Sequence, residues 1–428
     1  MNKPSIAVKA LCAAVVCAAA TFLSACARKP APRRAYAPLA PEGTLVAAVS
    51  ETKGLATNPM ALFLQDFNAS AGEALFDAVQ ASGLEPPREK PDFEAAKKRG
   101  IENCAKVNWT AFTMAKPAFE IRDVSGDEPF DFPAVALVYS LVEPSSIAKI
   151  EGDLKKDLAL VLASADKEAI SRVREFFDAN FTIADDSAAG VPVRKLQAKP
   201  EGDAAGALQM VRGLEPCYGV FDASLLIFAS SPRVFADTVA LYSGNAPTTT
   251  DALVAADLAL GGKAQSRCGI YGVADFLKDF VGEFVIDGID EEPRKFVKSL
   301  RNLRFSSTLD GEAMSATFSL CASFDDETLA PALSSLASGA KGMAAFMAAP
   351  ITAEKPALAP FMNIFNSLAV KAEGDSTIVE LTATKADIEA IDPVAIFSQC
   401  GVLGLDADDE DDEADDDSDD DDDDDDEE

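Results

Sequence analysis

The sequence predicts an α+β fold in which antiparallel strands and helices alternate in two halves. Apolar residues recur at every second position over 303–320, interrupted by Asp310-Gly311, which is typical of a β-hairpin. They recur at every third or fourth position over 60–75, which is typical of an amphipathic helix. Segments of both kinds lie on each side of a break at 244–250, where Gly, Asn, Pro and three consecutive Thr residues end any periodicity.

The first half is expected to open with a strand over 44–49. Asn58-Pro59 then marks a helix start, because asparagine caps a helix and proline suits its first turn. The run 134–139 is continuously apolar, so we expect a central strand there. The other elements expected in this half are helices over 92–106, 144–161, 166–177 and 232–242, and strands over 109–114, 118–122, 191–197, 218–221 and 225–229.

The second half is expected to contain two hairpins. In the first, 303–309 pairs with 314–320 through a two-residue type I′ turn at Asp310-Gly311. In the second, 369–372 pairs with 377–383. The helices expected in this half cover 327–348, 356–367 and 385–399.

A short internal similarity raises the hypothesis that the two halves arose by duplication. Tyr-Gly-Val-Phe-Asp at 218–222 resembles Tyr-Gly-Val-Ala-Asp at 271–275, and chance similarity is the alternative for so short a segment. We divide the chain into a signal peptide (1–25), a lipidated basic Pro-rich tether (26–43), an α+β half (44–246), a second α+β half (247–405) and a disordered acidic tail (406–428).

The N-terminus predicts export. Lys3 and Lys9 accompany an uncharged run over 10–23, which is shorter than the roughly 20 residues that span a bilayer and suits a signal peptide. The run ends in the tetrapeptide Leu23-Ser24-Ala25-Cys26. This tetrapeptide resembles the lipobox of bacterial lipoprotein precursors.

The resemblance covers residues 1–26 and implies cleavage before Cys26, which would carry acyl chains such as palmitate and hold the protein in the cell envelope. By analogy with Gram-negative sorting, Ala27 after the cysteine favours the outer membrane, at its periplasmic face or at the cell surface. The alternative is cleavage before Arg28, which would release a soluble secreted protein. The mature domain is similar to uncharacterised exported bacterial proteins in layout alone.

The net charge and its distribution along the chain argue for some classes of binding partner and against others. The chain has 38 Lys and Arg against 71 Asp and Glu, a net charge of −33, which argues against nucleic acid as a partner. Four cations between Cys26 and Glu42 could lie on anionic lipid headgroups. The tail 406–428 holds 20 acidic residues among 23, so we expect a solvated polyanion, with weak binding of divalent cations or a cationic partner as the functional alternative.

The residue types leave few routes to catalysis. The chain has no histidine, which excludes the Ser-His-Asp triad and His-ligated zinc. Five cysteines follow Cys26, and we expect buried apolar thiols, with one or two disulfides as the alternative. They are Cys104, Cys217, Cys268, Cys321 and Cys400, none in a Cys-x-x-Cys motif. We therefore expect no metal and no cofactor.

Two Ser-x-x-Lys tetrads, Ser146–Lys149 and Ser338–Lys341, are the nucleophile candidates, together with the Ser-x-Asn at 243–245. In penicillin-binding proteins and serine β-lactamases such motifs act with a Lys-Thr-Gly on a strand, which this chain lacks. Ser146 is better explained as a helix cap. A carboxylate-based hydrolase is a further alternative, but no pair of acids stands out.

An apolar cluster in the second half is the remaining candidate binding feature. We expect it to pack in the core, with a groove for a lipid or peptide as the alternative. Its members are Phe346, Met347, Phe361, Met362 and Phe365. The sequence thus predicts a membrane-anchored envelope lipoprotein acting as a non-catalytic binding or structural module. The alternatives are an envelope hydrolase and a lipid or peptide carrier.

Overall fold

The computed structural model describes residues 36–83, 90–121, 130–142, 179, 181–199, 215–261, 264–280 and 291–399. Several predictions fall outside these residues. They concern the signal peptide and lipobox, the helices over 144–161 and 166–177 with the Ser146–Lys149 tetrad, Cys400, and the acidic tail.

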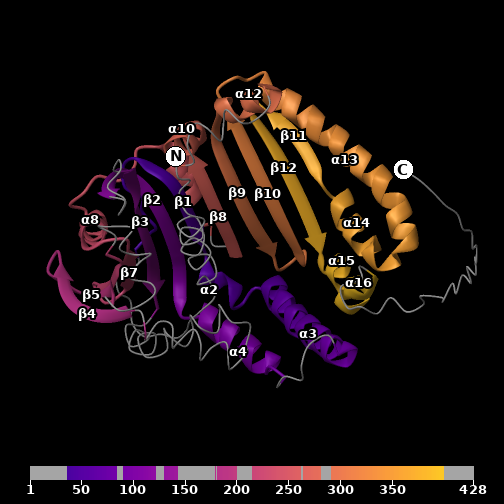
Figure 1. The fold of residues 1–428 in the computed structure, drawn as a ribbon, viewed down its shortest axis with the longest axis horizontal. Coiled ribbons are helices and arrows are strands. Elements are labelled where there is room, and N and C mark those ends of the chain that lie inside the picture. The colour runs from indigo at the N-terminus through magenta and orange to yellow at the C-terminus, as the bar shows by residue number, and fades with distance from the viewer. Residues whose placement is uncertain are drawn as a thin grey trace, which may run out of the picture.

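One antiparallel sheet runs through the described part of the chain and, with its helices, confirms the predicted α+β class (Figure 1). Its twelve described strands follow the order β11-β12-β10-β9-β8-β1-β2-β3-β7-β6-β5-β4. Their bounds are β1 Thr44–Ser50, β2 Val107–Ile121, β3 Phe130–Leu141, β4 Phe181–Ala188, β5 Val191–Ala198, β6 Cys217–Phe221, β7 Leu225–Ala229, β8 Ala264–Tyr271, β9 Leu300–Asp310, β10 Ser315–Phe324, β11 Ala369–Glu373 and β12 Ser376–Thr384.

The described helices lie along both faces and the ends of this sheet (Figure 1). Their bounds are α2 Thr52–Leu55, α3 Pro59–Ser82, α4 Phe93–Cys104, α8 Pro232–Tyr242, α9 Ala252–Leu258, α10 Val273–Phe280, α12 Glu291–Ser299, α13 Leu329–Glu354, the 3-10 turn η1 Pro356–Leu358, α14 Ala359–Asn366, α15 Lys385–Glu389 and α16 Pro393–Gln399.

The two predicted halves meet side by side within the sheet. Strands β1 to β7 lie on one side and β8 to β12 on the other, and β1 pairs with β8, with Ala48 opposite Cys268. The two similar pentapeptides do not take equivalent places. Tyr218 is the second residue of β6, whereas Tyr271 is the last residue of β8 and α10 begins at Val273.

Local chemistry explains where the first long helix begins. Asn58 caps α3, because its Oδ1 accepts hydrogen bonds from the amides of Met60 at 2.9 Å and Ala61 at 3.0 Å. Its Nδ2 donates to the Leu309 carbonyl at 3.0 Å, so the same side chain ties α3 to β9. Gly83, with a φ of 70°, ends the helix in the left-handed conformation that glycine favours.

Several predicted boundaries were wrong in detail. The strands expected over 109–114 and 118–122 are one strand, β2, with an irregular register between Ala115 and Phe119. The turn at Asp310-Gly311 is a four-residue loop, because Asp310 pairs with Ser315. The Asp310 carboxylate accepts from the amides of residues 312 and 313, which favours this wider loop. Pro393 begins α16, so the helix expected over 385–399 is two helices.

The first half of the sheet packs on α8 to form the largest buried cluster. Trp109, 3% exposed, stacks on Tyr242 with ring centroids 6.4 Å apart and donates from Nε1 to the Tyr36 carbonyl at 2.8 Å. Ala40, 2% exposed, belongs to a neighbouring cluster with residues of β1 and α9. Residues 36–43, expected in the tether, therefore pack as part of the folded body.

The two edge strands carry charged side chains. β4 carries Asp185 and Asp186, which face Arg194 and Lys195 at N–O distances of 3.7 and 2.7 Å. At the other edge, β11 carries Lys371, which lies 3.4 Å from Glu380 of β12. The sheet thus ends on both sides in ion-paired, solvent-facing strands.

Candidate functional site

Strands β9, β10 and β12 carry large apolar side chains side by side on one face of the sheet. Strand register places five large apolar side chains next to one another on this face, which we call the apolar sheet face. Leu320 lies opposite both Phe305 and Val379, and Phe318 lies opposite Leu381. Paired residues of neighbouring strands share one face, so these side chains form a continuous surface.

The reverse side of the same strands is polar. Ser306 lies opposite Ser319, and the Oγ1 atoms of Thr317 and Thr382 lie 3.1 Å apart. This alternation follows the strand period of two and is what a sheet with one covered face and one solvated face requires. The sequence therefore marks the apolar sheet face as the side that should be buried.

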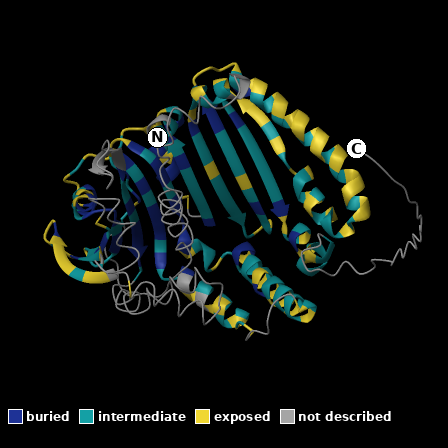
Figure 2. Cartoon of the chain, in the orientation of Figure 1, coloured by how far each residue is buried: buried dark blue, intermediate teal, exposed yellow. Residues whose placement is uncertain are grey.

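The centre of the apolar sheet face is nevertheless open. Phe305 of β9 and Phe318 of β10 are 45% and 51% exposed, and Figure 2 shows exposed positions along the middle of these two strands. Among the described residues, helices pack on the two ends of these strands. α3 packs on the end that contains Ala316, whereas α12 and the first turns of α13 pack on the end that contains Ala322 and Phe324.

The outward side of α13 is a second exposed apolar surface. Phe346 is 81% exposed and Met343 65%, although both belong to a long helix packed beside β11 and β12 (Figure 2). Large side chains recur on this side at helical spacing, and we call them the α13 outer face: Leu336, Met343, Phe346, Met347 and Ile351. Between Leu329 and Ala353 the helix has one charged residue, Lys341.

The first turns of α13 pack inward through Leu329 and Leu333, but beyond them the inward side of the helix is made of small and polar residues. Ala330 is buried and its carbonyl accepts from Thr377 Oγ1 at 2.8 Å. Lys341 Nζ donates to the Asn366 carbonyl at 3.0 Å and also to that of Leu368, so its charge stabilises the C-terminal end of α14. The helix is thus inverted relative to an ordinary amphipathic helix, which turns its large apolar residues inward.

The expectation of core packing for the apolar cluster of the second half was wrong for three of its members. Phe346, Met347 and Phe361 are exposed, at 81%, 59% and 43%. Met362 and Phe365 are half-buried. These three residues therefore do not belong to the buried core of the described chain.

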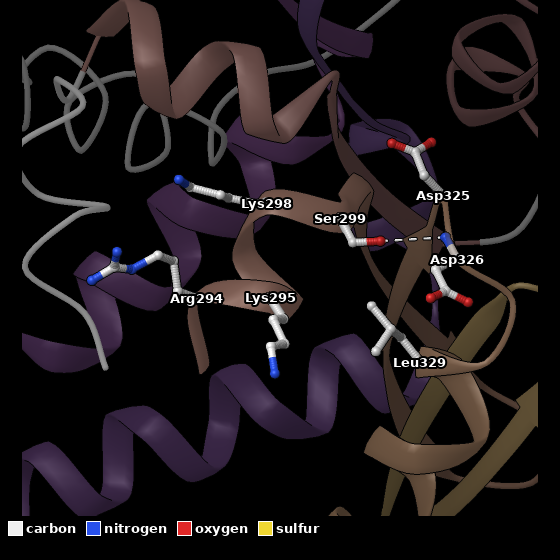
Figure 3. A pocket seen from close by; sticks show the side chains of 7 residues that line it. All are labelled: Arg294, Lys295, Lys298, Ser299, Asp325, Asp326 and Leu329. Atoms are coloured by element: carbon white, nitrogen blue, oxygen red, sulfur yellow. Dashed lines mark hydrogen bonds between the residues drawn. The ribbon is translucent and has the colours of Figure 1, made fainter. Parts of the chain in front are cut away.

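A shallow pocket of about 570 Å³ lies between α12 and the start of α13. Figure 3 shows Arg294, Lys295 and Lys298 on the α12 side and Asp325 and Asp326 near the other side. Ser299 Oγ accepts from the Asp326 amide at 3.3 Å, and the pocket is completed by Leu329. The pocket is therefore lined by positively and negatively charged side chains, and it lies next to the covered end of the apolar sheet face.

A buried ion pair lies at the seam on the polar side of the sheet. Asp257 of α9 accepts from Arg304 Nε at 2.8 Å and Nη2 at 2.5 Å, and from the Tyr271 hydroxyl at 2.7 Å. Burial and the Asp257 hydrogen bond raise the pKa of Tyr271, and the Asp257 hydrogen bond raises the pKa of Arg304. Each acceptor has a donor, so this cluster joins α9, β8 and β9 and serves the fold.

The four described cysteines are free thiols. Cys104 and Cys217 are buried, as predicted, whereas Cys268 and Cys321 are half-buried. Burial raises the pKa of Cys217 to about 12 and also raises the pKa of Cys104 and Cys268, so these three thiols are protonated at neutral pH.

The catalytic candidates in the described residues do not assemble into a site. Lys341 is held by the carbonyls of Asn366 and Leu368, and Ser243 Oγ donates to the Val239 carbonyl at 2.6 Å at the end of α8. Within the described ranges no three or more Cys, Asp or Glu side chains gather in a way that could hold a metal ion. None of the described helices combines the length and apolar character needed to cross a membrane.

Comparison with known proteins assigns no family. No family model matches the chain, and no curated protein matches it. Two solved structures that it resembles are crystal form III of TP0453, with a TM-score of 0.37 and 8% identity, and crystal form I of TP0453, with a TM-score of 0.34 and 10% identity. The match covers 86% of this chain in both cases, and 100% and 98% of the respective TP0453 chains.

Proposed function

We propose that the protein is a lipid-anchored bacterial envelope lipoprotein whose body is a non-catalytic binding module for lipid. In this proposal Cys26 carries the acyl anchor and the apolar sheet face receives the hydrocarbon part of a lipid. The observation that supports the binding role is the exposure of Phe305 and Phe318, at 45% and 51%. Both lie at the centre of a sheet face whose apolar pattern is that of a buried core.

The chemistry of the apolar sheet face favours hydrocarbon over a peptide. Its five large side chains offer no hydrogen-bond donor or acceptor, and Phe318 and Leu320 lie on a strand whose backbone is paired with β9 and β12 on both sides. A peptide would bury unpaired amides and carbonyls there, which is costly. An acyl chain has no such groups and gains about 25 cal/mol for each Å² of apolar surface removed from water.

The pocket beside α12 supports a phospholipid as the ligand class. Leu329 and Phe296 pack in the cluster at the covered end of the apolar sheet face, and Leu329 also lines the pocket. The pocket carries cations from α12 and the carboxylates of Asp325 and Asp326. A zwitterionic headgroup has a phosphate and an ammonium group, so it can pair with both kinds of side chain.

Binding is tested with a fluorescent fatty acid, cis-parinaric acid, titrated into the purified full mature chain. We expect saturable binding that weakens by about tenfold in a Phe305→Ser, Phe318→Ser double variant, since two half-exposed rings would lose contact with the chain. Ile183→Ser is the matched control, because Ile183 is 47% exposed on β4 at the opposite edge of the sheet. Equal binding by the double variant and the wild type would refute the assignment of the site.

The anchor is tested separately by an intact mass of the protein purified from bacterial membranes. A mass that fits cleavage before Cys26 plus acyl chains supports the envelope lipoprotein. A mass that fits an unmodified chain beginning at Arg28 refutes the anchor and leaves the lipid-binding role to be judged by the titration alone.

A further inference from the structure

The α13 outer face holds five of the eleven exposed large apolar side chains of the described chain, and the proposed lipid-binding site does not use them. Its five large side chains, from Leu336 to Ile351, are 47% to 81% exposed. A soluble protein gains nothing by exposing Phe346 in this way, since apolar surface in water is unfavourable. Contiguous exposed apolar surface marks a contact with a protein or a membrane.

The distribution of charge decides between these partners. The chain has 71 acidic residues, yet none lies between Leu329 and Ala353, and acids resume on both sides of that interval at Glu327 and Glu354. Lys341, the one cation of the interval, is held by the carbonyls of Asn366 and Leu368. A polar rim normally surrounds a protein interface, whereas a helix face without charge suits the acyl boundary of a bilayer, where a carboxylate is expensive.

The predicted anchor would keep the folded body near lipid. Tyr36 is the first described residue, ten residues after Cys26, and its carbonyl accepts from Trp109 Nε1 in the folded body. Ten residues span at most about 35 Å when fully extended, so acyl chains on Cys26 would keep the body close to the bilayer. Such confinement makes a weak contact sufficient for stable docking.

We infer that α13 lies in the plane of the membrane and docks on it through its outer face, with Phe346 and Met347 in the acyl boundary. This inference rests on the proposed envelope anchor. The helix packs against β11 and β12 on its other side, and it does not meet the length and hydropathy needed to cross a bilayer. An interfacial helix of this kind is stabilised by the apolar area that it inserts.

The single tryptophan of the chain makes the inference directly testable. Trp109 is 3% exposed and lies in the first half of the sheet, so bromine atoms on lipid tails should leave its emission unchanged. A Phe346→Trp variant adds one reporter on the α13 outer face. The full mature chain is purified from membranes and reconstituted into vesicles of phosphatidylcholine brominated on its acyl chains.

We expect the emission added at position 346 to be strongly quenched, and that added by Ile183→Trp on β4 to remain. Adding Met343→Glu to Phe346→Trp should abolish the quenching, because a carboxylate one turn away would be drawn out of the hydrocarbon. Unchanged Trp109 emission reports that these variants fold. Equal quenching at positions 346 and 183, or persistent quenching with the added glutamate, would overturn the inference.

Two further outcomes separate this inference from the proposed function. If the intact mass has no acyl chains but the position 346 reporter is quenched after addition to preformed vesicles, the anchor fails and docking stands. If acyl chains are present and the reporter is not quenched, the anchor stands and docking fails. A lipid-free dimer that Phe346→Asp converts to a monomer would instead assign the α13 outer face to a second copy of the chain.

Discussion

Replacing Arg304 with methionine removes the cation that balances a buried carboxylate at the seam of the sheet. The Asp257 side chain is 5% exposed and would keep only the Tyr271 hydroxyl as its described donor. Breaking a buried pair costs about 3–5 kcal/mol, but the Arg304 side chain is 31% exposed and its charge is partly solvated. We therefore expect a loss of about 2–3 kcal/mol in the free energy of unfolding.

Urea unfolding followed by tryptophan emission measures this loss. Trp109 lies in the first half of the sheet, whereas Arg304 lies in β9 of the second half. If the sheet unfolds as one unit, the Trp109 transition and the far-ultraviolet circular dichroism should both shift to lower urea. With an m-value of about 3 kcal/mol/M, the expected shift is roughly 0.7–1 M.

A double variant and a surface control complete the test. In Asp257→Asn, Arg304→Met the buried charge is gone, so the combined loss should be smaller than the sum of the single losses. Arg233→Met is the control, because Arg233 is 74% exposed and lies 4.0 Å from Asp237 in an exposed pair of little consequence. An unchanged midpoint for Arg304→Met, or strictly additive losses, would refute the role given to the ion pair.

Four further outcomes follow from single contacts. Burial and a hydrogen bond raise the pKa of Tyr271 in the folded state, so its contribution to stability is fully present below about pH 10 and is lost above it; Tyr271→Phe should flatten the urea midpoint against pH in that range. Gly269→Ala should cost about 1–3 kcal/mol by urea unfolding, since its Cβ would lie 2.3 Å from the Tyr271 hydroxyl. Asn58→Ala should cost about 1–2 kcal/mol, and Asn58→Asp less, because aspartate keeps the cap and loses only the donor to Leu309. Cys217, buried and with a pKa of about 12, should react with a thiol reagent at pH 8 only in urea, as read by mass spectrometry; modification of the native protein would contradict its burial.

The sequence was most informative where one short-range signal dominates. The alternation through Phe305 and Phe318 predicted both strands of the central hairpin and which side chains share a face. Asn58-Pro59 predicted the start of α3, because a cap and a first-turn proline act within four residues. The loop after Asp310 was missed because its carboxylate binds two amides, which the dipeptide alone does not reveal.

The open surfaces could not be predicted, because coverage depends on where distant segments lie. The hairpin pattern marks a core face but does not say that the helices that pack on this face lie at its ends. In α13 nearly every residue is small or apolar, so periodicity gives no clear inward side, and the usual rule would turn Phe346 inward. Its 81% exposure reverses that rule.

The charged edge strands have a consequence for the behaviour of the protein at high concentration. A sheet open at both ends could in principle recruit further strands and grow into a fibre. Asp185 and Asp186 at one end and Lys371 at the other would have to lose water and their ion pairs before a strand from another molecule could join. The charged edge strands β4 and β11 therefore disfavour strand pairing between molecules. The chain can thus expose apolar surface on the faces of the sheet without forming fibres through its edges.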